Sequence, residues 1–261
     1  MLGCSRKFYS GRIWLVKDSG LMTDSKKFPR GAHDLEGRST VELLQWAVEQ
    51  YAPRLTFATG FGPEGCVIID LIGRHRLPID VFTLDTGLLF PETYELWRRL
   101  EEWSGVQIRA VQPSLSVGDQ ATVHGDRLWE KRPEQCCEMR KVVPLKAELK
   151  NVDAWISAIR REQTPQRSTA LVAEWDSKFD IAKINPLVRW TKKEVWNHLR
   201  KHEVPYNPLH DQDYPSIGCS PCTSPVQPGE DERAGRWRDS NKTECGLHSP
   251  IIPVEPVSET A

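Results

Sequence analysis

Apolar residues recur along this chain in two patterns, one with the period of an amphipathic helix and one with the short continuous run of a buried strand. Helical spacing is found in four segments: STVELLQWAVEQY (39–51), CVIIDLIGRH (66–75), PETYELWRRLEEW (91–103) and TKKEVWNHLRKH (191–202). The first and last begin with capping boxes, Ser39 with Glu42 and Thr191 with Glu194. Pro91 suits the first turn of the third segment. We therefore expect a helix in each of these segments.

Short apolar segments alternate with these helices and predict strands. They are LTFAT (55–59), IDVFTLD (79–85), VQIRAVQ (106–112), DAWISAI (153–159) and IAKINPL (181–187). The second is apolar and β-branched enough for a buried parallel strand. The alternation of strand and helix predicts an α/β fold built on a doubly wound, mostly parallel sheet. In such sheets ligands bind outside the carboxyl ends of the strands, at a topological switch point.

The two ends of the chain lack this pattern. Residues 1–30 show no sustained period, so we expect a loosely ordered N-terminal arm before an α/β domain at 31–225. A C-terminal segment, 226–248, follows this domain. Residues 249–261 carry three prolines and predict a flexible tail.

Composition and charge narrow the class of protein. The chain has 261 residues, of which 39% are hydrophobic and 27% charged, as in soluble globular proteins. Its net charge of -1 does not attract nucleic acid or an anionic membrane over long range. An anionic ligand therefore needs a local basic site. No apolar run approaches the ~20 residues of a membrane span, and the N-terminus lacks a secretory pattern. We expect a cytoplasmic protein with reduced thiols, in keeping with an odd number of cysteines, seven.

Two loops at predicted strand ends are candidates for binding a nucleotide. TGFGPEG (59–65) and LDTGLLFPET (84–93) each lead into a helix, whose N-terminus favours an anion such as phosphate or sulfate. The candidate binding residues are Thr59, Gly60, Gly62, Asp85, Thr86 and Gly87. Either loop alone is also explained by tight turns and helix caps. Together they resemble the adenine-nucleotide α-hydrolase superfamily. The first loop lacks the Asp-Ser ending of members that cleave ATP, so we expect it to hold an anion rather than split a pyrophosphate.

Four of the cysteines form two pairs. Cys136 and Cys137 are adjacent in RPEQCCEMRK, and Cys219 and Cys222 form CSPC in a Gly/Pro-rich loop. Four thiolates suit a tetrahedral zinc ion or an iron–sulfur cluster. Adjacent cysteines have diverging side chains, which favours a larger group, a [4Fe–4S] cluster, over a single ion. Two unrelated buried pairs remain the alternative.

Cys245 lies apart from these pairs, in KTECGLH near the C-terminus. Basic residues surround it in the sequence: Arg233, Arg236, Arg238, Lys242 and His248. Such surroundings favour the nucleophilic thiolate, although a surface cysteine in a mobile tail is the plain alternative. We interpret Cys4 and Cys66 as bystanders, with Cys66 as a small core residue. We interpret Arg238 and Lys242 as charges on a solvated face.

The motifs LDTGLLFPETYEL, CCEMRK, IRREQTPQR, IAKINPL, CSPC and ECGLH span about residues 55 to 248. In this combination the chain resembles the assimilatory adenylyl-sulfate reductases, the iron–sulfur branch of the phosphoadenylyl-sulfate/adenylyl-sulfate reductase family. The resemblance implies that adenosine 5′-phosphosulfate binds across the two loops and that the Cys245 thiolate attacks its sulfur. AMP leaves, and an S-sulfocysteine remains. Thioredoxin or a glutaredoxin-like donor then releases sulfite, for sulfate assimilation and cysteine biosynthesis.

The transferred group is highly charged, so catalysis is expected from positioning and from cations around its oxygens. The candidates are Lys141, Arg161, Arg233 and Arg236, and each has a solvated-face alternative. Lys141 follows the cysteine pair and could link cluster and substrate electrostatically. His248 is a candidate for binding substrate or closing the tail over the site. Gly235 and Gly246 would let the Cys245 segment move between substrate and reductant.

Three other functions compete with this reading. The same thiol chemistry could reduce 3′-phosphoadenylyl sulfate, although family members that use it usually lack the two cysteine pairs. A tRNA-thiolating enzyme of the superfamily would need an ATP-cleaving loop and a basic RNA surface. A zinc-bound nucleotide sensor would leave Cys245 without a task. The sequence leaves open whether the chain forms a homo-oligomer.

Overall fold

The computed structural model describes residues 32–238, 240, 242 and 244–247. Its centre is a six-stranded sheet in the order β3-β2-β1-β4-β6-β5. The strands are β1 (Leu55–Thr59), β2 (Asp80–Leu84), β3 (Ile108–Val111), β4 (Ala154–Ile156), β5 (Ala173–Asp176) and β6 (Ile181–Ile184). Neighbouring strands run parallel except β5, which is antiparallel to β6 at the edge. The predicted doubly wound, mostly parallel sheet is confirmed.

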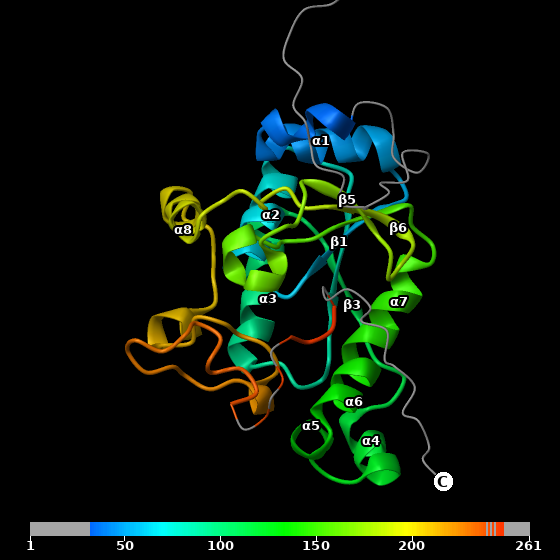
Figure 1. Ribbon diagram of the computed structural model, residues 1–261, viewed down its shortest axis with the longest axis vertical. Coiled ribbons are helices and arrows are strands. Elements are labelled where there is room, and N and C mark those ends of the chain that lie inside the picture. The colour runs from blue at the N-terminus through cyan, green and yellow to red at the C-terminus, as the bar shows by residue number, and fades with distance from the viewer. Residues whose placement is uncertain (1–31, 239, 241, 243, 248–261) are drawn as a thin grey trace, which may run out of the picture.

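Helices connect the strands and cover both faces of the sheet (Figure 1). They are α1 (Thr40–Tyr51), α2 (Pro63–Arg74), α3 (Pro91–Ser104), α4 (Val117–His124), α5 (Leu128–Lys131), α6 (Pro133–Cys137), α7 (Val143–Leu149) and α8 (Lys192–Lys201). A π-helical turn, Glu138–Val142, joins α6 to α7. Short 3-10 turns lie at Ala32–Gly37, Arg161–Gln163, Pro165–Arg167, Pro208–Gln212 and Ser220–Cys222. Both predicted capping boxes are present, at the starts of α1 and α8.

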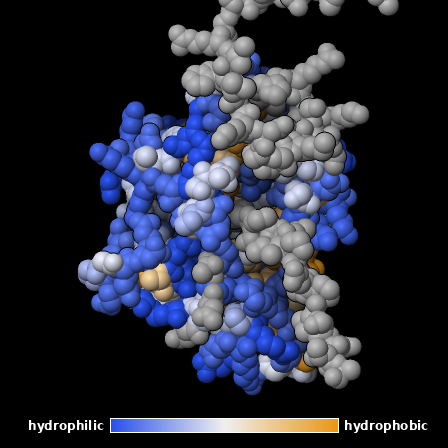
Figure 2. Space-filling model, viewed as in Figure 1, coloured by the Kyte–Doolittle hydropathy of each residue, from blue (hydrophilic) through white to orange (hydrophobic). Residues whose placement is uncertain are grey.

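The core has two parts, one on each face of the sheet. The larger part joins the inner sides of α1, α2, α3 and α8 to the strands around Phe57. The smaller part packs Leu145 and Leu149 of α7 against Phe82 and Trp155. Cys66 is fully buried in the larger part, which confirms its interpretation as a core residue. The surface seen in Figure 2 is largely hydrophilic where it is described.

Several elements differ from the sequence prediction. The strand expected at 153–159 ends at Ile156, and β5 was not expected at all. The helices between residues 117 and 149 also escaped the pattern, because each is only four to eight residues long. In the described part of the chain, no helix has the length and apolar character needed to span a bilayer. The predicted N-terminal arm, 1–30, and the predicted C-terminal tail, 249–261, lie outside the described residues.

Candidate functional site

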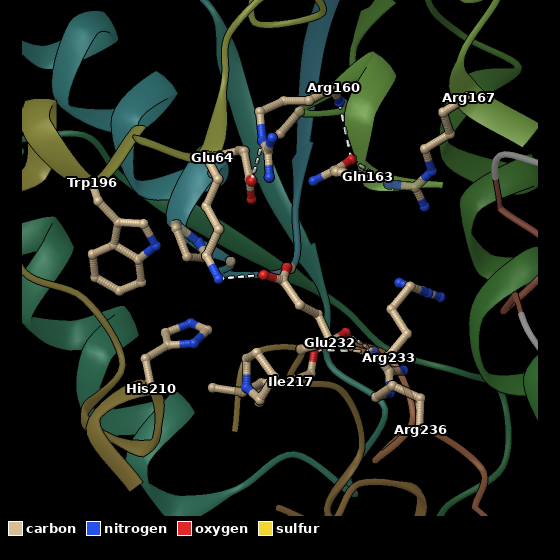
Figure 3. Close-up of a pocket in the computed structure, with 18 of the residues that line it drawn as sticks. Glu64, Arg160, Gln163, Arg167, Trp196, His210, Ile217, Glu232, Arg233 and Arg236 are labelled. Atoms are coloured by element: carbon tan, nitrogen blue, oxygen red, sulfur yellow. Dashed lines mark hydrogen bonds and ion pairs between the residues drawn. The ribbon is translucent and has the colours of Figure 1, made fainter. Parts of the chain in front are cut away.

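A cavity of about 540 Å³, shown in Figure 3, is lined by residues that follow the carboxyl ends of β1 and β4. These neighbouring strands continue in opposite directions across the sheet, since β1 leads to β2 on one side and β4 to β6 on the other. The cavity therefore lies at the switch point where an α/β sheet binds ligands. Its walls are formed by the loop after β1, the segment after β4, α8, residues 210–217 and the C-terminal segment.

The loop after β1 lines the cavity with Gly60, Gly62 and Gly65. Gly62 is the N-cap of α2, so the free amides of that helix begin here. Thr59 is buried beneath the loop, where its Oγ1 accepts a hydrogen bond from the amide of Phe61 at 3.1 Å. A Cβ on Gly65 would lie 2.7 Å from that same oxygen. The predicted anion loop is thus folded tightly, with Thr59 supporting it from below.

The segment after β4 supplies Arg160, Gln163 and Arg167 to the cavity. The buried Arg160 donates from Nε to Glu64 Oε1 at 2.6 Å, and Arg167 donates to Gln163 Oε1, also at 2.6 Å. Sequence reasoning missed Glu64, Arg160 and Arg167. The 3-10 turns at 161–163 and 165–167 decide which side chains face inward, and these turns leave no periodic pattern.

Arg161, which the sequence put forward for substrate binding, is not brought to this cavity. Its Nε donates to the carbonyl of Ala170 at 2.8 Å, and its Nη2 pairs with Glu36 at 2.9 Å. The neighbouring Arg160 and Arg167 stand in the place that was expected for Arg161. The Arg161 side chain instead connects the segment after β4 to the 3-10 turn before α1.

The C-terminal segment brings Arg233, Arg236 and Cys245 to the cavity, as the sequence proposed. Arg236 stacks its guanidinium 4.4 Å from the ring centre of Trp237 and donates to Ser216 Oγ at 3.3 Å. Gly218 makes room for it, because a Cβ there would lie 2.2 Å from Arg236 Nη2. Burial lowers the pKa of Arg236 and of Arg167. Both cations are thus held in surroundings that strengthen their attraction for an anion.

Cys245 is half-buried at the edge of the cavity. Its neighbour Glu244 pairs with Arg167 and Arg233, each at 3.2 Å. The carbonyl of Gly246 accepts a hydrogen bond from Lys178. These contacts hold the thiol beside the arginines. His248, the other candidate in this motif, lies outside the described residues.

Two further cations of the segment differ from each other. The side chain of Lys242, predicted to lie on a solvated face, is 2% exposed; it pairs with Glu134 of α6 and lies over the ring of Trp237. That prediction was wrong for Lys242, because the segment folds back against the cysteine-bearing helix. Arg238 is exposed and pairs with Glu230 at 2.9 Å, as expected of a surface charge.

The two cysteine pairs line one small cavity. Cys136 and Cys137 come from α6, Cys219 is the N-cap of the 3-10 turn Ser220–Cys222, and Cys222 is the last residue of that turn. Burial raises the pKa of Cys137 to about 11 and that of Cys222 to about 12. Among the described residues, no three His, Cys, Asp or Glu side chains are arranged to hold a single metal ion. Four sulfurs around one cavity, three of them on buried residues, nevertheless form a donor set suited to a sulfur-ligated group.

The loop after β2 contacts the residues around the cysteine cavity and not those of the 540 Å³ cavity. Thr86 Oγ1 lies 3.3 Å from Cys219 Sγ, and the carbonyl of Thr86 accepts from Arg140 Nε at 2.6 Å. Gly87 adopts a left-handed φ of 67° at this turn. None of the three predicted residues, Asp85, Thr86 and Gly87, is among those that line the 540 Å³ cavity.

Asp85 is occupied by internal hydrogen bonds. It accepts from Tyr94 Oη at 2.7 Å, from Gln112 Nε2 at 3.0 Å and from the amide of Gly87 at 3.0 Å. Burial opposes ionisation, but these donors outweigh it and lower the pKa of Asp85. The carboxylate therefore fixes the loop that carries Thr86.

Lys141 lies between the two sites. It lines the cysteine cavity. Burial alone would lower its pKa, but the nearby sulfurs of Cys219 and Cys245 raise it. Lys141 is thus close enough to interact with both the cysteine pairs and the isolated Cys245.

Comparison with known proteins agrees with this architecture. Residues 54–225 match the family described as "Phosphoadenosine phosphosulfate reductase domain". The adenosine 5′-phosphosulfate reductase of Halalkalibacterium halodurans is 47% identical over 82% of this chain and 93% of its own. Adenosine 5′-phosphosulfate reductase 1 of Bacillus subtilis is also 47% identical, over 81% of this chain and 91% of its own.

Solved structures show the same relationship. The phosphoadenylyl-sulfate reductase of Candida auris, in a phosphate complex, superposes with a TM-score of 0.67 and 33% identity, over 75% of this chain and 94% of its own. An FMN adenylyltransferase of Candida glabrata, 12% identical with a TM-score of 0.51 over 85% of this chain and 76% of its own, shares the fold alone. With two thirds of its residues inside the matched domain and relatives this similar along most of their length, the chain belongs to the phosphoadenosine phosphosulfate reductase family.

Proposed function

We propose that this protein reduces adenosine 5′-phosphosulfate to sulfite and AMP in sulfate assimilation and cysteine biosynthesis. The observation that carries the proposal is the position of Cys245, a thiol at the edge of a switch-point cavity that also contains Arg167, Arg233 and Arg236. The cavity is large enough for a nucleotide, since small-molecule sites are typically ~300–1,000 Å³. The curated relatives that are 47% identical carry the same activity in their names.

The chemistry begins at Cys245. Its thiolate attacks the sulfur of the substrate, an S–S bond forms, and the S–O bond to the phosphate breaks with its electron pair leaving on AMP. The product on the enzyme is an S-sulfocysteine. A thiolate of thioredoxin, or of a glutaredoxin-like protein, then attacks the Cys245 sulfur and expels sulfite. Its second thiol resolves the mixed disulfide, so the two electrons come from the reductant's dithiol.

The chain's own residues position and stabilise the transferred group. Arg167, Arg233 and Arg236 surround the place where sulfate oxygens must lie when the sulfur faces Cys245. Preorganised cations in a partly desolvated site stabilise charge that shifts in the transition state. Lys141 adds a positive charge on the side of the cysteine pairs. The loop after β1 presents amides at the start of α2 for the nucleotide phosphate.

We propose that Cys136, Cys137, Cys219 and Cys222 hold a [4Fe–4S] cluster. The support is the donor set itself: four sulfurs line one buried cavity next to Lys141. When bound, such a cluster supplies a structural and electrostatic centre beside the site. Purified protein should be brown, with a broad band near ~400 nm from thiolate-to-iron charge transfer. A colourless protein with stoichiometric zinc would contradict the cluster.

Sulfonate transfer to the enzyme can be tested without a reductant. The protein is incubated with adenosine 5′-phosphosulfate and the intact chain is weighed. A sulfonate adduct should form on Cys245 and be absent from Cys245→Ser. Release of sulfite without any adduct would argue against the covalent route.

The competing substrate is 3′-phosphoadenylyl sulfate, because the superposed Candida auris structure is a reductase of that compound. A side-by-side measurement of kcat/KM for the two sulfonucleotides, with thioredoxin as reductant, decides between them. We expect adenosine 5′-phosphosulfate to be preferred, in line with the closer similarity to reductases of that compound. A tRNA-thiolating enzyme or a nucleotide sensor would reduce neither.

The proposal also assigns tasks to the parts of the chain. Residues 31–225 form the nucleotide- and cluster-binding domain, and 226–248 carry Cys245 to the substrate and then to the reductant. Before the reductant attacks, residues 226–248 must leave the cavity, because a protein as large as thioredoxin cannot reach Cys245 while this segment covers it. We place the reaction in the cytoplasm, where thioredoxin keeps thiols reduced.

A further inference from the structure

Glu244, the residue before Cys245, places a carboxylate among the arginines of the cavity. Its oxygens lie 3.2 Å from Arg167 Nη2 and 3.2 Å from Arg233 Nη2. The Glu244 side chain is 12% exposed and that of Arg167 is 13% exposed, so this ion pair is largely shielded from water. A carboxylate is thus held between cations immediately beside the proposed nucleophile.

Two other cations of the cavity pair with different carboxylates. Arg160 is paired with Glu64, and Lys192 with Glu232. Glu244 is the carboxylate that Arg167 and Arg233 share. Arg236 lines the same cavity, and no carboxylate among the described residues pairs with it. Three guanidinium groups beside one carboxylate leave an excess of positive charge, so this end of the cavity can attract a second anion.

From this geometry we propose that the Glu244 carboxylate is an internal substitute for the sulfate of the substrate, and that the two compete for Arg167 and Arg233. The inference rests on the proposed function, because it places the transferred sulfate at the Cys245 end of the cavity. A sulfate has three free oxygens and so can accept hydrogen bonds from the same guanidinium groups that the carboxylate now holds. Binding of substrate would then release Glu244 from the arginines while Cys245 stays within reach of the sulfur.

The same competition has a consequence after transfer. The sulfonate is then attached to Cys245, next to the Glu244 carboxylate in the chain, and two negative groups face one set of arginines. The arginines can bind the sulfonate or the Glu244 carboxylate, but not both in the same position. Once AMP leaves, the repulsion between them favours departure of the segment from the cavity, which exposes the S-sulfocysteine to the reductant.

The test is Glu244→Gln, which keeps the shape of the side chain and removes its charge. Both this variant and its parent carry Cys245→Ser, so that substrate binds without turnover, and the Kd for adenosine 5′-phosphosulfate is measured by calorimetry. We expect binding to tighten roughly tenfold, since a charge-assisted hydrogen bond to the competing carboxylate no longer has to be broken. Inorganic sulfate should raise the melting temperature of Glu244→Gln more than that of the parent.

Glu230→Gln is the matched control, because Glu230 also pairs with an arginine of the same segment, Arg238 at 2.9 Å, but does not line the cavity. It should leave both affinities unchanged. Unchanged or weaker binding of substrate and sulfate to Glu244→Gln would overturn the proposal and show that Glu244 only orders the arginines. The sulfate measurement needs no turnover. The proposed function alone would be refuted if sulfate raised the melting temperature of Glu244→Gln more than that of its parent while the wild-type protein reduced neither sulfonucleotide.

Discussion

Two arginines six residues apart have opposite surroundings. Arg167 is partly buried at the cavity wall with Gln163 and Glu244, whereas Arg161 points away from the cavity to Glu36 and Ala170. We expect Arg167→Ala to lower kcat/KM for adenosine 5′-phosphosulfate about 10²- to 10³-fold, the usual cost of removing one donor that stabilises a transition state. Steady-state rates with thioredoxin measure this.

Arg161→Ala is the control for that measurement. It removes an arginine from the same segment and costs at most a modest amount of stability, because its ion pair with Glu36 is part-exposed. Its kcat/KM should stay within about threefold of wild type. Equal losses in the two variants would mean that the segment as a whole, rather than the guanidinium of Arg167, is what the reaction needs.

Among elements, the C-terminal segment depends on a close approach at Gly235. A Cβ there would lie 2.0 Å from the carbonyl oxygen of Ser224, while the Ser224 amide donates to the Gly235 carbonyl at 2.9 Å. The sequence suggested Gly235 as a point of motion; the structure gives it a packing role beside the bridge between Thr223 and Arg236. This approach places Arg236 at the cavity.

Gly235→Ala should therefore displace Arg236. Because the clash is with backbone, we expect a loss of about 1–3 kcal/mol in the free energy of unfolding together with a raised KM. Urea unfolding and steady-state kinetics measure the two effects. Gly118→Ala in α4 is the control: its Cβ would meet nothing closer than 3.8 Å, so it should stabilise slightly. A Gly235→Ala protein with wild-type KM would show that the segment can shift without moving Arg236.

The elements that the sequence predicted are those with strong local signals. The capping boxes at Ser39 and Thr191 were predicted correctly because each signal lies within a few residues. The expected strands are present as well, although most are shorter than their apolar segments. The edge strand β5 was missed because its sequence, AEWD, is half-buried throughout and carries no apolar alternation. The region of α4 to α7 was missed because Gly125 and Pro133 interrupt its first half, and because the π-helical turn Glu138–Val142 breaks the 3.6-residue period between α6 and α7.

The candidate site was predictable to a similar degree. Pairing the adjacent cysteines with CSPC follows from chemistry, and the structure does bring all four to one cavity. The choice among Arg160, Arg161 and Arg167 could not be made, because 3-10 turns set their directions. Nor could the sequence show that Thr86 faces Cys219 instead of the nucleotide cavity, since that depends on how two distant loops meet.

At the scale of the whole molecule, three helices on one face of the sheet meet at a single buried carboxylate. Asp70 of α2 bonds Arg74 Nε at 2.8 Å, Trp103 Nε1 of α3 at 3.3 Å and His198 Nε2 of α8 at 2.9 Å. Asp70 is 2% exposed. The network fixes α8 against the sheet, and α8 carries Lys192, Trp196 and Arg200 to the cavity wall. The packing of this face is therefore connected to the geometry of the site.

Asp70→Asn should destabilise the protein by about 3 kcal/mol at neutral pH, because it removes the charge from a buried network whose partners then lack compensation. Burial opposes ionisation of Asp70, but the hydrogen bonds from His198, Arg74 and Trp103 lower its pKa below the ordinary 3.8. A lowered carboxyl pKa adds stability that is complete above that ordinary value and is lost as the pH falls through the folded-state pKa. The difference in the free energy of unfolding between wild type and Asp70→Asn should consequently shrink as urea unfolding is repeated from pH 7 down to pH 3.

Asp153→Asn is the control. It removes the carboxylate of an equally close but exposed pair with Arg54, at 2.9 Å, and should cost less than about 1 kcal/mol. If Asp70→Asn lost no more stability than Asp153→Asn at pH 7, the network would be a consequence of apolar packing between α2, α3 and α8 and not one of its causes.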